Sequence, residues 1–395
     1  MFLFKKVINA GLVLSVFFYF CSFAFAQGNL HIGALEIHPF ASLEQKYNDN
    51  IFLEQDNQEN DDWITTTTLG FGLKMPLVAQ REEDFLLKAE YAADIIEFWD
   101  YSGQSRIDHS ISTTADFLFA NDVTFKLKDN FKKTADPATS ELTALEKRLR
   151  NTVEAVLGYK REKIGVDLGY TNIREDYDAL DSLDKYEHVL TATGYYELFP
   201  KTSILCEYNF GQIIYDDNAT NSDSEYNQWR IGLEGEIASK LTGVVKAGFK
   251  STSYDDASRS DFNGFTLFAN LTYKMRERST LNIYGERESV ESTYRTLSHY
   301  ESNKIGLTLD HQLLERLFLV LADSYQFNKY PDETTENSLT AKRKDTIWDG
   351  KIGLRYEIKD WLHMETGYEY KQRDSKFATF DYKNNIFSVK ATFVF

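Results

Sequence analysis

Apolar and polar residues alternate with a period of two nearly from end to end of the chain. In the last ten residues Phe387, Val389 and Ala391 fall on one side of an extended strand, while Ser388 and Lys390 fall on the other. An amphipathic helix would repeat every 3.6 residues, so the pattern predicts strands. The clearest further examples are residues 163–170, 229–237, 241–250, 265–274, 348–357 and 362–371.

The predicted strands are long. They run to about ten residues, which is the length needed to cross a bilayer when tilted. Strands of soluble sheets usually run to about five or six residues. A strand that is apolar on one side and polar on the other suits a wall between lipid and water. The pattern therefore favours a sheet that spans a membrane, closed on itself so that every backbone group is paired.

Short and long connections alternate between the predicted strands. Short links fall at 120–122, 160–162, 199–201, 238–240, 276–278 and 359–360, and long polar links fall at 48–62, 132–145, 174–185, 216–224, 253–260, 289–298, 328–344 and 373–378. Short periplasmic turns and long outer loops are typical of transmembrane barrels. We therefore predict an all-β fold, a transmembrane antiparallel up-and-down β-barrel of about eighteen strands. About sixteen is the alternative, because residues 84–119 and 288–312 are less regular.

The start of the chain predicts export. Lys5 and Lys6 precede an apolar run over residues 7–20, and Ala24-Phe25-Ala26 follows, which is the three-part pattern of a signal peptide. An uncleaved anchor is the alternative. We predict a signal peptide over residues 1–26 and one barrel domain over residues 27–395. Loss of the two lysines changes the net charge from −17 to −19, which argues against nucleic acid as a partner.

The predicted inward faces carry charges of both signs. The candidate pore-lining residues are Glu154, Asp167, Glu207, Arg230, Glu234, Lys246, Asp310, Asp349, Lys351, Arg355, Glu365 and Glu369. A wall of this kind is hydrophilic without the single-sign ladder of a strongly charge-selective pore. A barrel of this size is wide enough for an aqueous channel unless something plugs it. The alternative is that these charges only neutralise one another.

Aromatic residues gather near the predicted strand ends. Examples are Phe98, Trp99, Tyr101, Tyr215, Trp361 and Tyr382. Transmembrane barrels carry aromatic girdles at both membrane interfaces, so we expect these residues there. Ordinary packing is the alternative for each of them.

No catalytic motif is present. The sequence lacks G-x-S-x-G, H-E-x-x-H and paired C-x-x-C patterns, and its seven histidines are dispersed. We therefore expect no enzyme activity, no cofactor and no metal site. A hydrolase site assembled in space from the barrel wall is the alternative.

Two segments carry a resemblance to a known family. The stretch Pro39–Phe52 resembles the start of the putative β-barrel porin 2 family, in which the first strand ends in a step like Tyr47-Asn48-Asp49-Asn50-Ile51-Phe52. The aromatic terminus, with Phe393 and Phe395, resembles the signal that the barrel assembly machinery reads in bacterial outer-membrane barrels.

The resemblance implies a location and a function. It implies a bacterial outer-membrane channel that passes or helps to export exopolysaccharide. The implied partners are outer-membrane lipid, lipopolysaccharide, the barrel assembly machinery, polysaccharide and periplasmic export components. A general diffusion porin for small solutes, and a closed structural or adhesive barrel acting through its outer loops, are the alternatives.

Overall fold

The structure, a computed structural model, describes residues 30–78, 81, 84–217, 221–294 and 297–395, and these are almost entirely β-strand. The expected signal peptide lies outside the described residues. The strands are β1 (Leu30–Ile32), β2 (Leu35–Asn48), β3 (Asp62–Pro76), β4 (Phe85–Phe98), β5 (Arg106–Leu118), β6 (Val123–Thr134), β7 (Arg148–Arg161), β8 (Ile164–Tyr177), β9 (Lys185–Phe199), β10 (Thr202–Tyr215), β11 (Ser224–Ala238), β12 (Leu241–Tyr254), β13 (Phe262–Arg276), β14 (Ser279–Glu291), β15 (His299–Leu314), β16 (Leu317–Glu336), β17 (Leu339–Lys359), β18 (Leu362–Ser375) and β19 (Tyr382–Val394). Single 3₁₀ turns cover Ser102–Gln104, Ala120–Asp122, Asp181–Leu183 and Ala378–Phe380.

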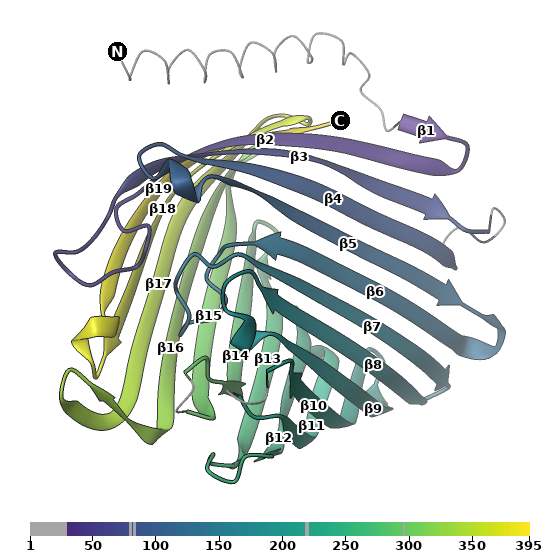
Figure 1. Cartoon of the computed structure of the whole chain (residues 1–395). Helices are drawn as coiled ribbons and strands as arrows, with labels where there is room; N and C mark the ends of the chain where they lie inside the picture. The colour runs from purple at the N-terminus through teal and green to yellow at the C-terminus, as the bar shows by residue number, and fades with distance from the viewer. Residues whose placement is uncertain (1–29, 79–80, 82–83, 218–220, 295–296) are drawn as a thin grey trace.

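Eighteen of these strands close into one barrel (Figure 1). Each strand from β2 to β19 pairs antiparallel with the next, and β19 pairs with β2 to complete the ring. The prediction of eighteen strands is confirmed, and the alternative of sixteen is wrong. The short β1 folds back on β2, where Leu30 lies opposite Ile37. The alternation in the sequence did not reveal this extra strand because it is only three residues long.

The two ends of the barrel differ in their connections. Two residues join β7 to β8, β9 to β10, β11 to β12 and β13 to β14, whereas connections such as 49–61, 135–147 and 255–261 lie at the other end. We call these the short-turn end and the outer end. One expected loop is wrong: 328–344 is mostly strand, because β16 and β17 stay paired as far as Glu336 and Leu339. Asn337 and Ser338 make the turn with positive φ angles, as hairpin turns of two residues require.

The two faces of the sheet have opposite chemistry. On β8 the residues Ile164, Val166 and Leu168 are exposed on the outer face, while Asp167 points to the lumen. Apolar side chains facing outward make sense where the surroundings are lipid. None of the helices in the described ranges is long and apolar enough to span a membrane.

Candidate functional site

Residues 135–147, which we call the crossing segment, span the outer opening of the barrel (Figure 1). They leave the end of β6 and return at the start of β7, the fifth and sixth strands of the ring counted from β2. Their tip contacts side chains on β15, β16 and β18, the fourteenth, fifteenth and seventeenth strands. The segment therefore reaches the wall about half the ring away from its origin.

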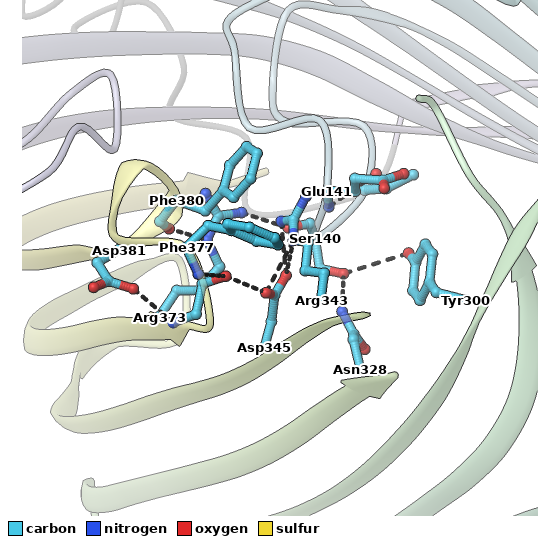
Figure 2. Close-up of polar contacts among 12 residues, drawn as sticks. Ser140, Glu141, Tyr300, Asn328, Arg343, Asp345, Arg373, Phe377, Phe380 and Asp381 are labelled. Atoms are coloured by element: carbon cyan, nitrogen blue, oxygen red, sulfur yellow. Dashed lines mark hydrogen bonds and ion pairs between the residues drawn. The ribbon is translucent and has the colours of Figure 1, made fainter. Parts of the chain in front are cut away.

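Ser140 is the first anchor of the tip (Figure 2). Its hydroxyl oxygen accepts a hydrogen bond from Asn328 Nδ2 at 2.9 Å and another from Gln326 Nε2 at 3.2 Å. The Tyr300 hydroxyl lies 3.4 Å from the same oxygen. Arg373 Nη1 donates to the Ser140 carbonyl oxygen at 2.9 Å. All four partners face the lumen, so the tip lies inside the ring of strands.

Glu141 is the second anchor. Its carboxylate accepts hydrogen bonds from the Thr293 backbone N–H at 2.6 Å, the Thr293 hydroxyl at 3.0 Å and the Ser292 hydroxyl at 3.0 Å. The side chain is buried. Burial raises the pKa of the Glu141 carboxyl above its usual value, and the hydrogen bonds from Thr293 and the charge of Arg343 offset only part of that effect.

A buried ion pair supports the wall beneath this tip. Arg343 Nη2 lies 2.7 Å from Asp345 Oδ2, and both side chains are almost completely buried. The guanidinium lies over the Phe380 ring at 3.7 Å and the Tyr330 ring at 4.8 Å. The Ser375 hydroxyl donates to Asp345 at 2.6 Å. The buried charge of Arg343 is tolerated because it is paired with Asp345 and stacked on aromatic rings.

The base of the crossing segment is more open than its tip. Asp136 Oδ2 lies 3.2 Å from Lys132 Nζ, and both side chains are more than half exposed. Arg106 Nη2 lies 3.2 Å from Asp136 Oδ1. Further along, Leu145 packs against the lumen-facing cluster that contains Ile51 and Phe98.

Three predicted pore-lining residues meet in one cluster, in which Glu207 is buried and Arg230 and Lys246 are partly buried. Glu207 is flanked by Arg230, whose Nε donates at 2.7 Å, and by Lys246, whose Nζ donates at 2.5 Å. Asn209 donates to the same carboxylate at 3.1 Å and also to Gln228 at 3.1 Å. Three strands, β10 to β12, supply the charges of this cluster from one face.

The other predicted pore-lining residues form looser pairs. Glu154 lies 3.1 Å from Lys128 Nζ, and Asp310 lies 3.2 Å from Arg355 Nη2. Lys371 bridges Glu369 at 2.6 Å and Asp349 at 3.8 Å. In the register of β17 and β18, Lys351 lies opposite Glu369 and Arg355 lies opposite Glu365. Asp167 and Glu234 line a pocket of about 520 Å³ near the short-turn end. Many of these charges pair as the alternative interpretation proposed, and their role in lining a pore stays a prediction.

For three of the aromatics, the predicted position in a membrane-interface girdle is wrong. Phe98, Tyr215 and Tyr382 are buried on the lumen side of the wall, where Phe98 packs with Ile51 and Tyr382 lies under Arg373. Alternation places a residue on a face, but near a strand end the phase of the pattern is hard to fix. These aromatics pack against other side chains inside the barrel rather than against lipid.

The last strand closes the barrel. Phe393 lies opposite Leu362 of β18 and Ala41 of β2, and its ring stacks on Trp361 with centroids 6.3 Å apart. The Phe395 N–H donates to the Pro39 carbonyl at 3.0 Å. Both aromatics therefore lie at the closing seam, and their reading by the assembly machinery stays a prediction.

Sequence reasoning missed the crossing segment. It identified residues 132–145 only as a long polar outer link. Leu142 and Leu145 are the apolar residues that could have suggested a segment packed inward rather than one lying in solvent. Within the described ranges, no group of three or more histidine, cysteine, aspartate or glutamate side chains is placed to hold a metal ion.

A closed eighteen-strand ring with a segment across one opening defines a porin-type barrel. The family described as putative beta-barrel porin 2 matches residues 25–395, so the chain belongs to this family, as the resemblance predicted. No curated protein matches the chain.

Solved outer-membrane proteins are similar to the chain in overall fold. OpdQ of Pseudomonas aeruginosa has a TM-score of 0.49 and 11% identity over 91% of this chain and 97% of its own. The siderophore receptor PirA of the same organism has a TM-score of 0.47 and 10% identity over 93% of this chain and 81% of its own. OpdK of the same organism, solved with vanillate, has a TM-score of 0.46 and 9% identity over 91% of this chain and 99% of its own.

Proposed function

We propose that the protein is an outer-membrane channel for hydrophilic solutes, narrowed at its outer end by the crossing segment. The observation that carries this proposal is the docking of Ser140 and Glu141 on the far wall, above a lumen lined by polar side chains. Solutes that leave the lumen must pass beside this segment. The family and the apolar outer face support the outer membrane as its location.

We propose exopolysaccharide as the cargo. The support is the family resemblance of the segment 39–52 and the mixed signs of the lumen charges, which suit a hydrated polymer better than one small ion. Aromatic faces that could guide sugars are less evident, because the lumen-side tyrosines Tyr226, Tyr254 and Tyr300 are buried. The partners in this proposal are lipopolysaccharide, the assembly machinery and separate periplasmic export components.

Single-channel conductance in planar bilayers tests the proposal. Replacing residues 135–147 by a short Gly-Ser link should raise the conductance of each channel, because the opening is then free. The matched control removes the tip of the hairpin of β16 and β17, residues 331–341. This tip extends past the last pairs with the neighbouring strands, at Lys329 and Asp345, and its removal should leave conductance unchanged. If neither the intact protein nor the loop variant conducts, the channel is excluded and a closed structural or adhesive barrel is favoured.

Polysaccharide fragments test the cargo. Fragments of the host's own exopolysaccharide, added on the periplasmic side, should interrupt the current of the variant that lacks the crossing segment. Uninterrupted current would contradict the polysaccharide proposal and favour a general diffusion porin for small solutes.

A further inference from the structure

The lumen face of β9 to β13 is sealed. Its inward side chains are buried or partly buried from the middle of the barrel to the outer end, and the fully buried ones include Thr193, Leu205, Glu207, Asn209, Gln228, Thr252 and Thr266. They also bond to one another: Gln228 Nε2 donates to Thr266 at 3.3 Å and to Glu288 of β14 at 3.0 Å. Water has little access to this part of the wall, which we call the sealed wall.

The lumen face of β4 to β7 is solvated. Its exposed inward residues are Lys88, Glu90, Ser112, Lys126, Asn130, Lys132 and Arg150. At the outer ends of these strands Asp108, Thr134 and Arg148 are buried beside the base of the crossing segment. We call this part the solvated wall.

The two walls also differ in side-chain exposure when residues at the same distance from the short-turn end are compared. Glu207 and Lys128 each lie five residues from the short-turn end of their strands, which begin at Thr202 and Val123. The Glu207 side chain is 6% exposed, whereas Lys128 is 40% exposed. Depth along the barrel axis therefore does not explain the difference, and the side of the lumen does.

We infer that the permeation path follows the solvated wall, and that Lys128 and Glu154 help to set its ion selectivity. This inference rests on the proposed channel function. A solute in an aqueous pore meets the side chains that water already reaches, and charges at that surface bias which ions enter. Glu207 is buried under two cations and out of reach of solutes, whereas Lys128 and Glu154, although paired with each other, remain open to water.

Cysteine labelling tests the path without relying on conductance. Ser112 on β5 and Thr193 on β9 are a matched pair, because both face the lumen six residues from the short-turn end, at Leu118 and Phe199. Ser112→Cys and Thr193→Cys are made in a Cys206→Ser background, since Cys206 is exposed. A negatively charged methanethiosulfonate reagent should label Ser112→Cys rapidly, by mass, and Thr193→Cys slowly. Equal labelling, or faster labelling of Thr193→Cys, would overturn the inference.

Reversal potentials in a salt gradient test the selectivity. Lys128→Gln should shift the channel toward cations, and Glu154→Gln should shift it toward anions. Lys133→Gln is the control, because Lys133 lies on the same strand as Lys128 but on the opposite face. Unchanged reversal potentials in both lumen variants would contradict the selectivity claim. A complete lack of conductance would instead contradict the channel function. The labelling result would still show which wall is accessible to solvent.

Discussion

The two walls of the lumen use the same residue types in different ways. On the sealed wall Glu207 holds two cations, Arg230 and Lys246, in a buried cluster. On the solvated wall Glu154 pairs with Lys128, and both side chains are more than one third exposed. The difference teaches that a charge on the inward face of a barrel is not by itself a pore-lining charge. What matters is whether neighbouring strands cover it.

The energetic consequences of this difference are large. A buried cation that loses its only carboxylate keeps its desolvation cost without compensation. An exposed pair exchanges one partner for water at little cost. Removing one carboxylate from each wall therefore compares a structural role with a surface role in the same barrel.

Glu207→Gln should give the largest effect. The variant keeps the shape of the side chain but leaves Arg230 and Lys246 without an opposing charge. We expect a loss of about 3–5 kcal/mol in the free energy of unfolding. Urea unfolding in detergent, followed by heat-modifiable gel migration, measures it. Stability equal to that of the unmodified protein would show that Glu207 does not stabilise the barrel through its ion pairs with Arg230 and Lys246.

The sequence predicted the face of these residues but not their burial. Alternation placed Glu207 and Glu154 inward on the same reasoning, because a period of two fixes only the side of the sheet. Burial depends on which residues of neighbouring strands lie alongside. Glu207 lies opposite Arg230 and Thr193, and this register is set by pairing across the whole ring. A single strand's pattern does not contain that information.

The crossing segment also has a buried part and an exposed part. Its tip is buried at Glu141, and its base is exposed at Asp136. Glu141→Ala should weaken docking of the tip by about 1.5–3 kcal/mol, because several hydrogen bonds to a carboxylate are lost. Hydrogen exchange over residues 135–147 should then become faster, and single-channel conductance should rise.

Asp136→Asn is the matched control for the base. Its ion pair with Lys132 is exposed, and Arg106 keeps Asp108 as an ion-pair partner, so we expect a change of no more than about 1 kcal/mol. Exchange that is faster in Asp136→Asn than in Glu141→Ala would show that the base, not the tip, holds the segment in place.

The docking partners of the crossing segment were beyond the sequence. Leu142 and Leu145 favour a loop that packs inward, but a loop has no period that shows which part of the wall it contacts. Ser140 docks on residues that lie 160 to 233 positions away in the chain. Only closure of the ring brings these residues together, so no local pattern could have identified Ser140 or Glu141 as anchors.

Docking of the tip should depend on pH. The pKa of Glu141 is raised in the docked segment above the ordinary value of 4.5, so the docked state binds the proton more tightly than the released state. Protonation therefore stabilises docking fully below pH 4.5, and this contribution is lost as the pH rises through the raised pKa.

Hydrogen exchange at a series of pH values, corrected for the intrinsic rate, measures this dependence. Protection of residues 135–147 should fall as the pH rises from 4.5 through the raised pKa. Glu141→Gln should remove the dependence while keeping the shape of the side chain. The same slope in Glu141→Gln would assign the titration to another group.

Glu154→Gln should give the smallest effect on stability, and it completes the comparison with Glu207→Gln. Its partner Lys128 is exposed and remains hydrated when the carboxylate is removed. We expect a change of about 0–1 kcal/mol in the free energy of unfolding, measured as for Glu207→Gln. A loss as large as that of Glu207→Gln would mean that the solvated wall is packed in the membrane-embedded protein. Water could not then follow it, and the exposure of Lys128 and Glu154 would no longer mark the path.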